Sequence, residues 1–150
     1  MPSEYRLKRR VQFYETDMAG IVHFSWFFRY LEEAEHAMWR EAGLSIAPPE
    51  SAIGWPRQEA SFAYHRPLRF EDEFEICIRI TAVEERKIRY MCVLTRDAKK
   101  IATGALTIVC VSKSRGEALR AIPIPPAIAA RFRAGPPFED QFIPPSEERS

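Results

Sequence analysis

The sequence lacks the short motifs that mark several common classes of enzyme. It contains no Gly-x-Ser-x-Gly turn, no Walker phosphate loop and no Gly-x-Gly-x-x-Gly fingerprint. Each of these motifs shapes a turn that presents a serine hydroxyl or a row of backbone amides to the substrate. A serine hydrolase, a phosphate-loop enzyme and a dinucleotide-binding enzyme are therefore not indicated.

Cysteine and histidine are scarce, with three residues of each type among 150. Cys77, Cys92 and Cys110 stand in separate apolar stretches, and no Cys or His pair has the spacing of metal ligands. An odd number of isolated cysteines favours reduced thiols in a core over a disulfide framework. We therefore expect no metal site, and the reduced thiols predict a cytoplasmic location.

Long hydrophobic runs and a large net charge are also missing. The longest apolar run, Ile101–Val111, is interrupted by polar residues and has about half of the roughly 20 residues that a membrane-spanning helix needs. The basic stretch Met1–Arg10 is followed by no apolar segment of signal-peptide length. The net charge of +1 does not favour nucleic acid or an anionic membrane. We expect no membrane span and no nucleic-acid partner.

What is present is the composition of one globular domain. Hydrophobic residues make up 46% of the chain and charged residues 29%, and a fold of this length buries about 70% of its unfolded surface. Seven of the 12 prolines lie at or beyond Pro123, which leaves room for only a short helix around Pro126–Phe132. The expected organisation is one domain over residues 1–134 and a mobile, proline-rich tail over residues 135–150.

One long helix is predicted between Ser25, which can cap its start, and Gly43, which can end it. Its apolar stripe recurs at spacings of three and four residues and comprises Phe27, Tyr30, Leu31, Ala34 and Met38. The charged residues from Arg29 to Glu41 cover the other face. The segment Leu44–Gly54 contains two prolines and is expected to be a loop.

Alternating apolar and polar residues predict five strands in the rest of the domain. They cover Leu7–Phe13, Arg57–Tyr64, Phe74–Thr81, Ile88–Thr95 and Ile101–Val111. A helix with one apolar stripe needs one sheet face to cover it. The pattern therefore predicts an α+β domain in which a curved five-stranded antiparallel sheet wraps around the helix. The strand Arg57–Tyr64 would leave an exposed sheet edge, which pairing with a second copy would cover. We therefore expect a homodimer or homotetramer.

Three stretches carry a resemblance to a known family. The most specific is TDMAGIVHF at residues 16–24, and the stretches ASFAYHRPLRFED at 60–72 and AIPIPP at 121–126 agree with it in order and spacing. Together they resemble the hotdog-fold acyl-CoA thioesterases of the 4-hydroxybenzoyl-CoA thioesterase type. The resemblance covers about residues 6–132.

This resemblance implies the hotdog fold and hydrolysis of an acyl-CoA thioester to a free acid and CoA at a subunit interface. It implies Asp17 as the catalytic carboxylate, acting as general base or as nucleophile. The backbone amide of Phe24 would donate to the oxyanion. Gly20 would shape the turn, and the amides of Val22 and His23 would lead toward the positive end of the helix. CoA is then part of the substrate, and no cofactor is expected.

Further candidates follow from the chemistry of an acyl-CoA, which has an apolar acyl group and several phosphates. They are Trp26, Trp55 and Phe62 for the acyl group, and Arg66, Arg69, Lys113 and Arg115 for the phosphates. The same aromatic side chains would also suit a core, and a scattered basic surface would contain the same cations. The imidazole of His23 would contact substrate or simply lie in the turn.

Other readings of the same residues stay open. Some hotdog thioesterases use a helix carboxylate, for which Glu32 and Glu33 are candidates, although solvated helix charges are the favoured explanation of both. A hydratase or dehydratase on this fold would need His23 or His65 to face Glu33 across the site. A third reading is a non-catalytic module that binds acyl-CoA. An apolar pocket would accept aromatic, branched or straight-chain acyl groups, on CoA or on an acyl carrier protein.

Overall fold

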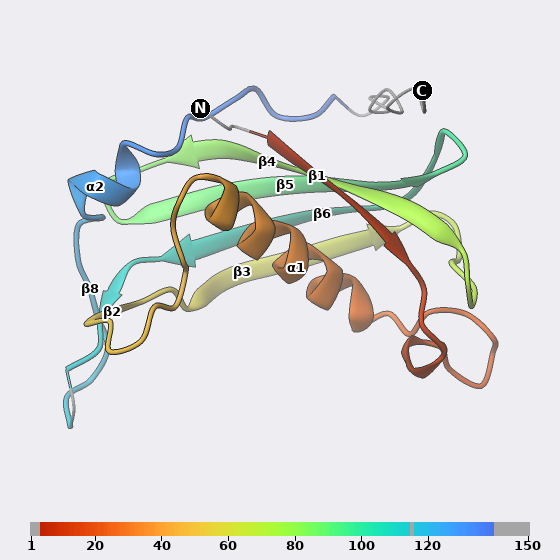
Figure 1. Ribbon diagram of the computed structural model, residues 1–150, viewed down its shortest axis with the longest axis horizontal. Coiled ribbons are helices and arrows are strands. Elements are labelled where there is room, and N and C mark those ends of the chain that lie inside the picture. Colours follow the sequence, from red (N-terminus) through yellow and green to blue (C-terminus); the bar gives the residue numbers. More distant parts are fainter. Residues whose placement is uncertain (1–3, 115, 140–150) are drawn as a thin grey trace.

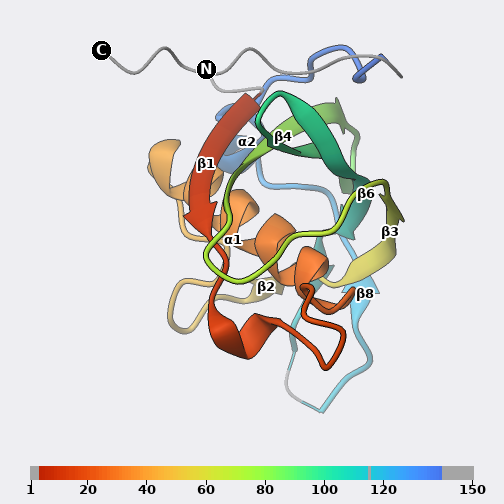
Figure 2. The same ribbon diagram turned by 90° about the vertical axis from the view of Figure 1, so that its right-hand side faces the viewer.

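The computed structural model describes residues 4–114 and 116–139 of the chain. Its main element is a five-stranded antiparallel sheet that curves around one long helix, α1 (Trp26–Glu41), as Figures 1 and 2 show. The strand order is β1-β4-β5-β6-β3. The strand bounds are Glu4–Arg10 for β1, Arg57–Tyr64 for β3, Glu73–Val83 for β4, Lys87–Arg96 for β5 and Lys99–Val109 for β6. The predicted α+β architecture is confirmed.

Helix α1 buries the stripe that the sequence predicts, because all five of its apolar residues are buried. They pack against the inner face of the sheet, where Ile76, Ile78 and Ile80 of β4 and Ile88 and Leu94 of β5 are fully enclosed. The helix ends where Gly43 was expected to end it, with the Gly43 amide donating to the carbonyl of Arg40 at 3.0 Å. Its start differs, since the Ser25 side chain makes no capping bond and lies 2.7 Å from Nδ1 of His23.

Strand β1 begins and ends three residues earlier than the sequence predicts. The predicted strand ran to Phe13, but Phe13–Glu15 forms a short 3-10 helix, η1. Arg9, the residue that breaks the apolar alternation of this strand, directs its guanidinium inward to the buried carboxylate of Glu15. The irregular position in the sequence pattern is therefore one half of an ion pair.

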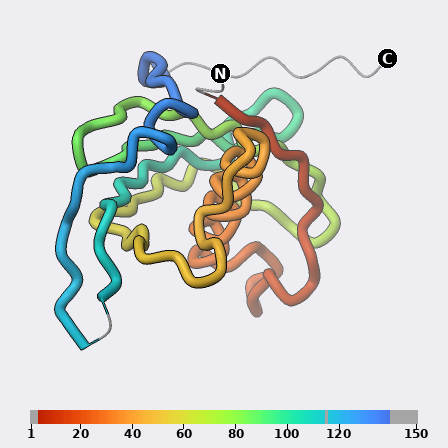
Figure 3. Tube along the Cα trace, turned by 60° about the vertical axis from the view of Figure 1, so that its left-hand side comes forward, coloured from red at the N-terminus to blue at the C-terminus, as the bar shows by residue number. Residues whose placement is uncertain are grey.

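A second, smaller sheet was not predicted. It joins β2 (Ile53–Gly54), β7 (Val111–Ser112) and β8 (Arg120–Ala121). Figure 3 shows the cyan and blue segments that carry β7 and β8 running side by side away from α1. Strands of two residues are too short to show any periodicity. The prediction of a loop over Leu44–Gly54 therefore missed β2, which covers its last two residues. The short helix α2 (Pro126–Ala129) falls within the predicted range.

Residues 135–139, which the sequence assigns to the tail, contact the face of the sheet that points away from α1. The Gly135 amide donates to the carbonyl of Ile80 at 2.8 Å. Phe138 is 8% exposed and packs with Cys77 and Val93, while the Arg79 guanidinium lies 4.1 Å from the centre of its ring. The rest of the expected tail, residues 140–150, lies outside the described residues.

The three cysteines are buried free thiols. Burial and the neighbouring Glu4 raise the pKa of Cys77 to about 12, and burial raises the pKa of Cys92 and Cys110 as well. Since the thiolate is the nucleophilic form, these side chains serve as core residues at neutral pH. In the part of the chain that the structure describes, no helix has the length and apolar character needed to span a membrane.

Gly104 of β6 is a position where the fold has no room for a side chain. It pairs with Phe62 of β3, and a Cβ built on Gly104 would lie 2.6 Å from the Phe62 ring. We expect Gly104→Ala to lower the free energy of unfolding by about 1–3 kcal/mol, because the ring must leave its place among its neighbours. Urea unfolding measures this. In a Phe62→Ala background the same substitution is expected to cost little, and an equal cost in both backgrounds would contradict the steric explanation.

Candidate active site

The segment that carries the most specific motif is a closed loop between η1 and α1. We call residues 16–22 the Asp17 loop. Thr16 and Val22 form a bridge at its base, and the Asp17 amide donates to the carbonyl of Ile21 at 2.9 Å. At the tip, the Gly20 amide donates to the Asp17 carbonyl at 3.0 Å, and Gly20 has a φ of +80° that favours glycine. The loop is therefore fixed by its own backbone.

The carboxylate of Asp17 is half-buried and has one structural and one unoccupied oxygen. Its Oδ1 accepts the amide of Ala19 at 2.8 Å, which fixes the orientation of the carboxylate. Among the described residues nothing donates to Oδ2. Asp17 thus shapes its turn, as the simplest reading of its spacing suggested, and also presents an acceptor oxygen for a substrate or a water molecule.

The amides that follow the loop differ in their availability. The Val22 amide donates to the carbonyl of Leu68 at 2.8 Å, and the His23 amide donates to that of Glu15 at 2.9 Å. The Phe24 amide has no acceptor within residues 4–114 and 116–139. It lies two residues before Trp26, the first residue of α1, where the backbone amides of a helix N-terminus attract negative charge. Of the three amides considered from the sequence, Phe24 alone has its donor free.

Aromatic rings gather beside the first turn of α1. Phe62 lies 5.9 Å from Phe27 and 5.0 Å from Phe28, measured between ring centres, and it stacks on Tyr64 at 6.1 Å. The Tyr64 hydroxyl donates to the carbonyl of Phe24 at 3.0 Å, which ties β3 to the site. We call these four side chains the aromatic cluster. Phe62 is therefore brought to the candidate site.

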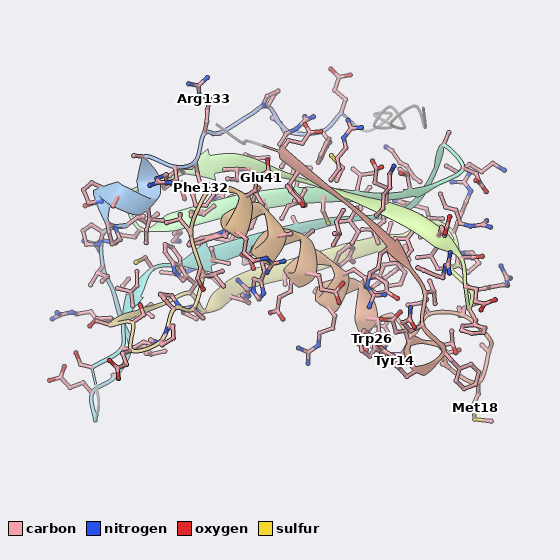
Figure 4. The ribbon with its side chains drawn as sticks, in the orientation of Figure 1. Tyr14, Met18, Trp26, Glu41, Phe132 and Arg133 are labelled. Carbon is pink, nitrogen blue, oxygen red and sulfur yellow. The ribbon has the colours of Figure 1, made fainter. Side chains whose placement is uncertain are left out.

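The two candidate tryptophans lie at opposite ends of α1. Trp26 packs against Tyr14 with 5.5 Å between ring centres, and Figure 4 shows both at the end of the molecule from which Met18 projects. Trp55 is buried against Trp39, 13 residues further along the helix and so roughly 20 Å away. The structure therefore places Trp26 near the Asp17 loop and Trp55 in the core at the far end.

The candidate cations are dispersed. Arg66 donates to the carbonyl of Lys100 at 2.8 Å and lines a groove of about 820 Å³ with His65. Lys113 follows β7, which pairs with β2 and β8, and Figure 1 shows β2 and β8 at the opposite end of the molecule from the loop that follows β1. Arg69 is exposed at a turn, and Arg115 lies outside the described residues. Of these cations, Arg66 is the one at the end of β3.

The sequence reading missed two buried ion pairs. Glu15 and Glu35 are both 0% exposed. Arg9 donates to Glu15 from Nη1 at 2.7 Å, and Arg57 donates to Glu35 from Nη2 at 2.6 Å. The sequence placed Glu35 on the solvated face of the helix, which is wrong because Arg57 of β3 reaches across to it. The only sequence signal was Arg9 at an apolar position of its strand.

The same two arginines also form ion pairs with Glu32 and Glu33, the helix carboxylates that were candidates for catalysis. Arg9 donates to Glu33 at 2.6 Å, and Arg57 donates to Glu32 at 3.2 Å. Arg29 pairs with Glu32 at 3.8 Å rather than with Glu33. His23 and His65 instead face Ser25 and Thr103 at hydrogen-bond distance. No group of three or more His, Cys, Asp and Glu side chains suited to a metal ion occurs in the described part of the chain.

The pKa values of the two buried carboxyls shift in opposite directions. Burial acts to raise the pKa of Glu15, but hydrogen bonds from Arg9 and the Gln12 amide outweigh burial, and the pKa is lowered. Burial raises the pKa of Glu35, and the opposing contribution of Arg57 does not cancel it. Glu15 is therefore held as a carboxylate near the Asp17 loop.

Comparisons with known proteins bear on both fold and activity. A family model described as "Thioesterase-like superfamily" matches residues 11–132. A protein of Aquifex aeolicus named "Putative esterase" is 33% identical over 115 residues, which are 76% of this chain and 88% of that protein. A 1,4-dihydroxy-2-naphthoyl-CoA hydrolase of Synechococcus elongatus is 26% identical over 112 residues, covering 73% and 82% of the two chains.

A solved structure supports the fold. It is an Asp-to-Asn variant of a 4-hydroxybenzoyl-CoA thioesterase in complex with 4-hydroxybenzoyl-CoA, with a TM-score of 0.78 and 21% identity. The match covers 88% of this chain and 100% of the other. At this identity the likeness concerns the fold alone, and the predicted hotdog fold is confirmed.

Proposed function

Because the chain belongs to the thioesterase-like superfamily, we propose that it hydrolyses an acyl-CoA thioester to a free acid and CoA at the Asp17 loop. The membership supports thioester hydrolysis in general. The observation that carries the finer proposal is one closed loop with an oriented carboxylate at one end and an unoccupied amide just beyond the other. These are the Asp17 carboxylate and the Phe24 amide.

The two groups have complementary chemistry. Asp17 Oδ2 takes a proton from water as the water oxygen attacks the thioester carbon, or attacks that carbon itself and forms an anhydride that water then hydrolyses. In both routes negative charge develops on the carbonyl oxygen, to which the Phe24 amide donates with the support of the α1 dipole. The carbon–sulfur bond breaks as this charge returns to the carbonyl, which in the second route forms the anhydride before water attacks it. CoA leaves as a thiolate that takes up a proton given up by the attacking water.

An aromatic acyl group suits this site best. The aromatic cluster lies beside Phe24, and aromatic rings pack in offset or edge-to-face geometry with one another. The relative from Synechococcus elongatus is named for a bicyclic aromatic acyl-CoA. We include Arg66 in the proposal as a contact for the CoA phosphates. Arg66 lies at the end of β3, the strand that supplies Phe62 and Tyr64 to the aromatic cluster.

The active unit in this proposal is a dimer or a dimer of dimers. Within the described residues no strand pairs with the outer edge of β3, and as whole residues all of β3 except Phe62 is exposed. An unpaired strand edge favours association with a second copy. Exposed apolar side chains also surround the Asp17 loop, namely Phe13, Tyr14, Met18, Phe24 and Phe70. A cytoplasmic location stays a prediction from the cysteines.

The test is release of free thiol from a panel of acyl-CoAs by the purified full-length protein. The panel contains 4-hydroxybenzoyl-CoA, 1,4-dihydroxy-2-naphthoyl-CoA, acetyl-CoA and hexanoyl-CoA. We expect turnover of the aromatic thioesters with a higher kcat/KM than that of the aliphatic ones. Hydration of an enoyl-CoA without thiol release would instead support the hydratase, and tight binding without turnover would support the binding module.

A further inference from the structure

Glu15 stands two residues before Asp17 and is fully enclosed. Its carboxylate accepts hydrogen bonds from three elements. Arg9 of β1 donates from Nη1 at 2.7 Å, the Gln12 amide before η1 donates at 2.7 Å, and the Tyr30 hydroxyl of α1 donates at 3.0 Å. A buried carboxylate with this many donors has one orientation, because any rotation would leave a buried charge unpaired.

The guanidinium that holds Glu15 is itself fixed. Arg9 donates a further bond to Glu33 on α1 at 2.6 Å, and its guanidinium carbon lies 4.5 Å from the centre of the Tyr30 ring. Strand β1 and helix α1 are therefore joined through Glu15 and Arg9 at the point where the Asp17 loop begins. The short helix η1 has no other ion pair among the described residues to fix it.

The backbone of the same residue closes the far side of the loop. The Glu15 carbonyl accepts the His23 amide at 2.9 Å. Asp17 stands two residues after Glu15 in the sequence, and Phe24 directly follows His23, whose amide is bonded to Glu15. Any shift of Glu15 would move both of the groups that the proposed reaction needs.

We propose that Glu15 is a positioning residue that holds the Asp17 carboxylate and the Phe24 amide at their working separation. This inference rests on the proposed function. An apolar residue of similar size could fill the same volume, but it would give no direction to η1, because hydrophobic packing is non-directional. The buried ion pair supplies geometry that packing alone does not.

The chain contains a matched control for this role. Glu35 is also fully enclosed, is also held by two bonds from one arginine, Arg57, and also interacts with a tyrosine, Tyr90. Unlike Glu15, it lies in the middle of α1, and its hydrogen-bond and ion-pair partners among the described residues, Arg57, Tyr90 and His36, lie outside the Asp17 loop. Glu15→Gln and Glu35→Gln therefore make the same chemical change at two enclosed, arginine-bound carboxyls in different places.

The experiment measures kcat and KM of both variants with the best thioester of the panel. We expect Glu15→Gln to lower kcat about 10- to 100-fold with KM changed by less than about threefold, because small displacements of reacting groups are costly to rate. Glu35→Gln is expected to change kcat by less than about threefold even though both variants lose thermal stability. Equal losses of kcat in the two variants would show a general structural role and overturn the proposal.

A second measurement keeps the proposal testable without turnover. Amide hydrogen exchange of residues 16–24 is expected to accelerate in Glu15→Gln and not in Glu35→Gln. Unchanged exchange in Glu15→Gln would overturn the positioning role. If the loop loosens but no thioester is hydrolysed by the unaltered protein, the proposed function fails while the effect of Glu15 on the loop stands.

Discussion

Replacing Asp17 by Asn is expected to lower kcat for thioester hydrolysis by about 10²- to 10⁴-fold, the typical contribution of a positioned acid–base group. The substitution suits this loop because the Asn carbonyl can still accept the Ala19 amide that Asp17 Oδ1 accepts at 2.8 Å. The turn is therefore retained, and the loss is confined to the basic and nucleophilic oxygen. KM, the oligomeric state and the melting temperature are expected to stay close to those of the unaltered protein.

The matched control is Asp72→Asn. Asp72 also accepts a backbone amide at a turn, that of Arg69 at 2.8 Å, and lies outside the Asp17 loop. Steady-state thiol release is expected to be unchanged by Asp72→Asn. If Asp17→Asn retained full activity while a helix variant such as Glu33→Gln lost it, the helix carboxylate would be the catalytic group and the role given to Asp17 would be wrong.

Arg57→Ala is expected to produce the largest loss of stability. It leaves the enclosed carboxylate of Glu35 without its bidentate partner, whose nitrogens lie 2.6 and 3.1 Å from the Glu35 oxygens. Breaking a buried pair from one side costs about 3–5 kcal/mol. Because the Arg57 side chain is 30% exposed and water screens it in part, we expect about 2–4 kcal/mol at neutral pH. Urea unfolding at equilibrium measures it.

The loss is expected to depend on pH. The pKa of Glu35 in the folded protein is raised above its ordinary value of 4.5 by burial. A raised folded-state pKa contributes stability that is fully present below the unfolded pKa and is lost as the pH rises through the folded one. Arg57 lowers the pKa of Glu35, so removing Arg57 raises that pKa further. Arg57→Ala should therefore be less damaging at about pH 5 than at about pH 7.5.

Two further variants isolate the cause. Glu32→Gln removes the other partner of Arg57, which is 40% exposed, and is expected to change stability by less than about 1 kcal/mol. Combining Arg57→Ala with Glu35→Gln should recover part of the loss, since no buried charge then remains. A cost for Arg57→Ala that is independent of pH and unrelieved in the double variant would refute this account.

The elements with long periodic patterns could be predicted from sequence, and those set by contacts between distant residues could not. The apolar stripe of α1 and the alternation in β4 reflect burial against one surface, which a sequence records directly. The partner of Glu35 depends on which side chain arrives from a distant part of the chain. From the sequence alone Glu35 is predicted to be solvated, because only the fold brings Arg57 beside it.

The same limit applied to the candidate site. Asp17 and Phe24 were found through a motif of consecutive residues, and the structure places Asp17 in the closed loop and Phe24 two residues beyond its end. Trp55 and Lys113 were chosen by residue type alone, and the fold places Trp55 at the far end of α1 and Lys113 directly after β7 of the smaller sheet. Glu15 had no signal of its own, because a glutamate after a strand usually faces water.

The contact made by Phe138 has a consequence for how copies of this chain can assemble. Its ring packs on Cys77 and Val93, on the face of the sheet that points away from α1, and the Arg79 guanidinium lies over the ring. A second copy that packed on this surface would first have to displace the ring of Phe138. While the ring is seated there, this part of the outer sheet face is covered by the chain's own residues 135–139 and is closed to a second copy.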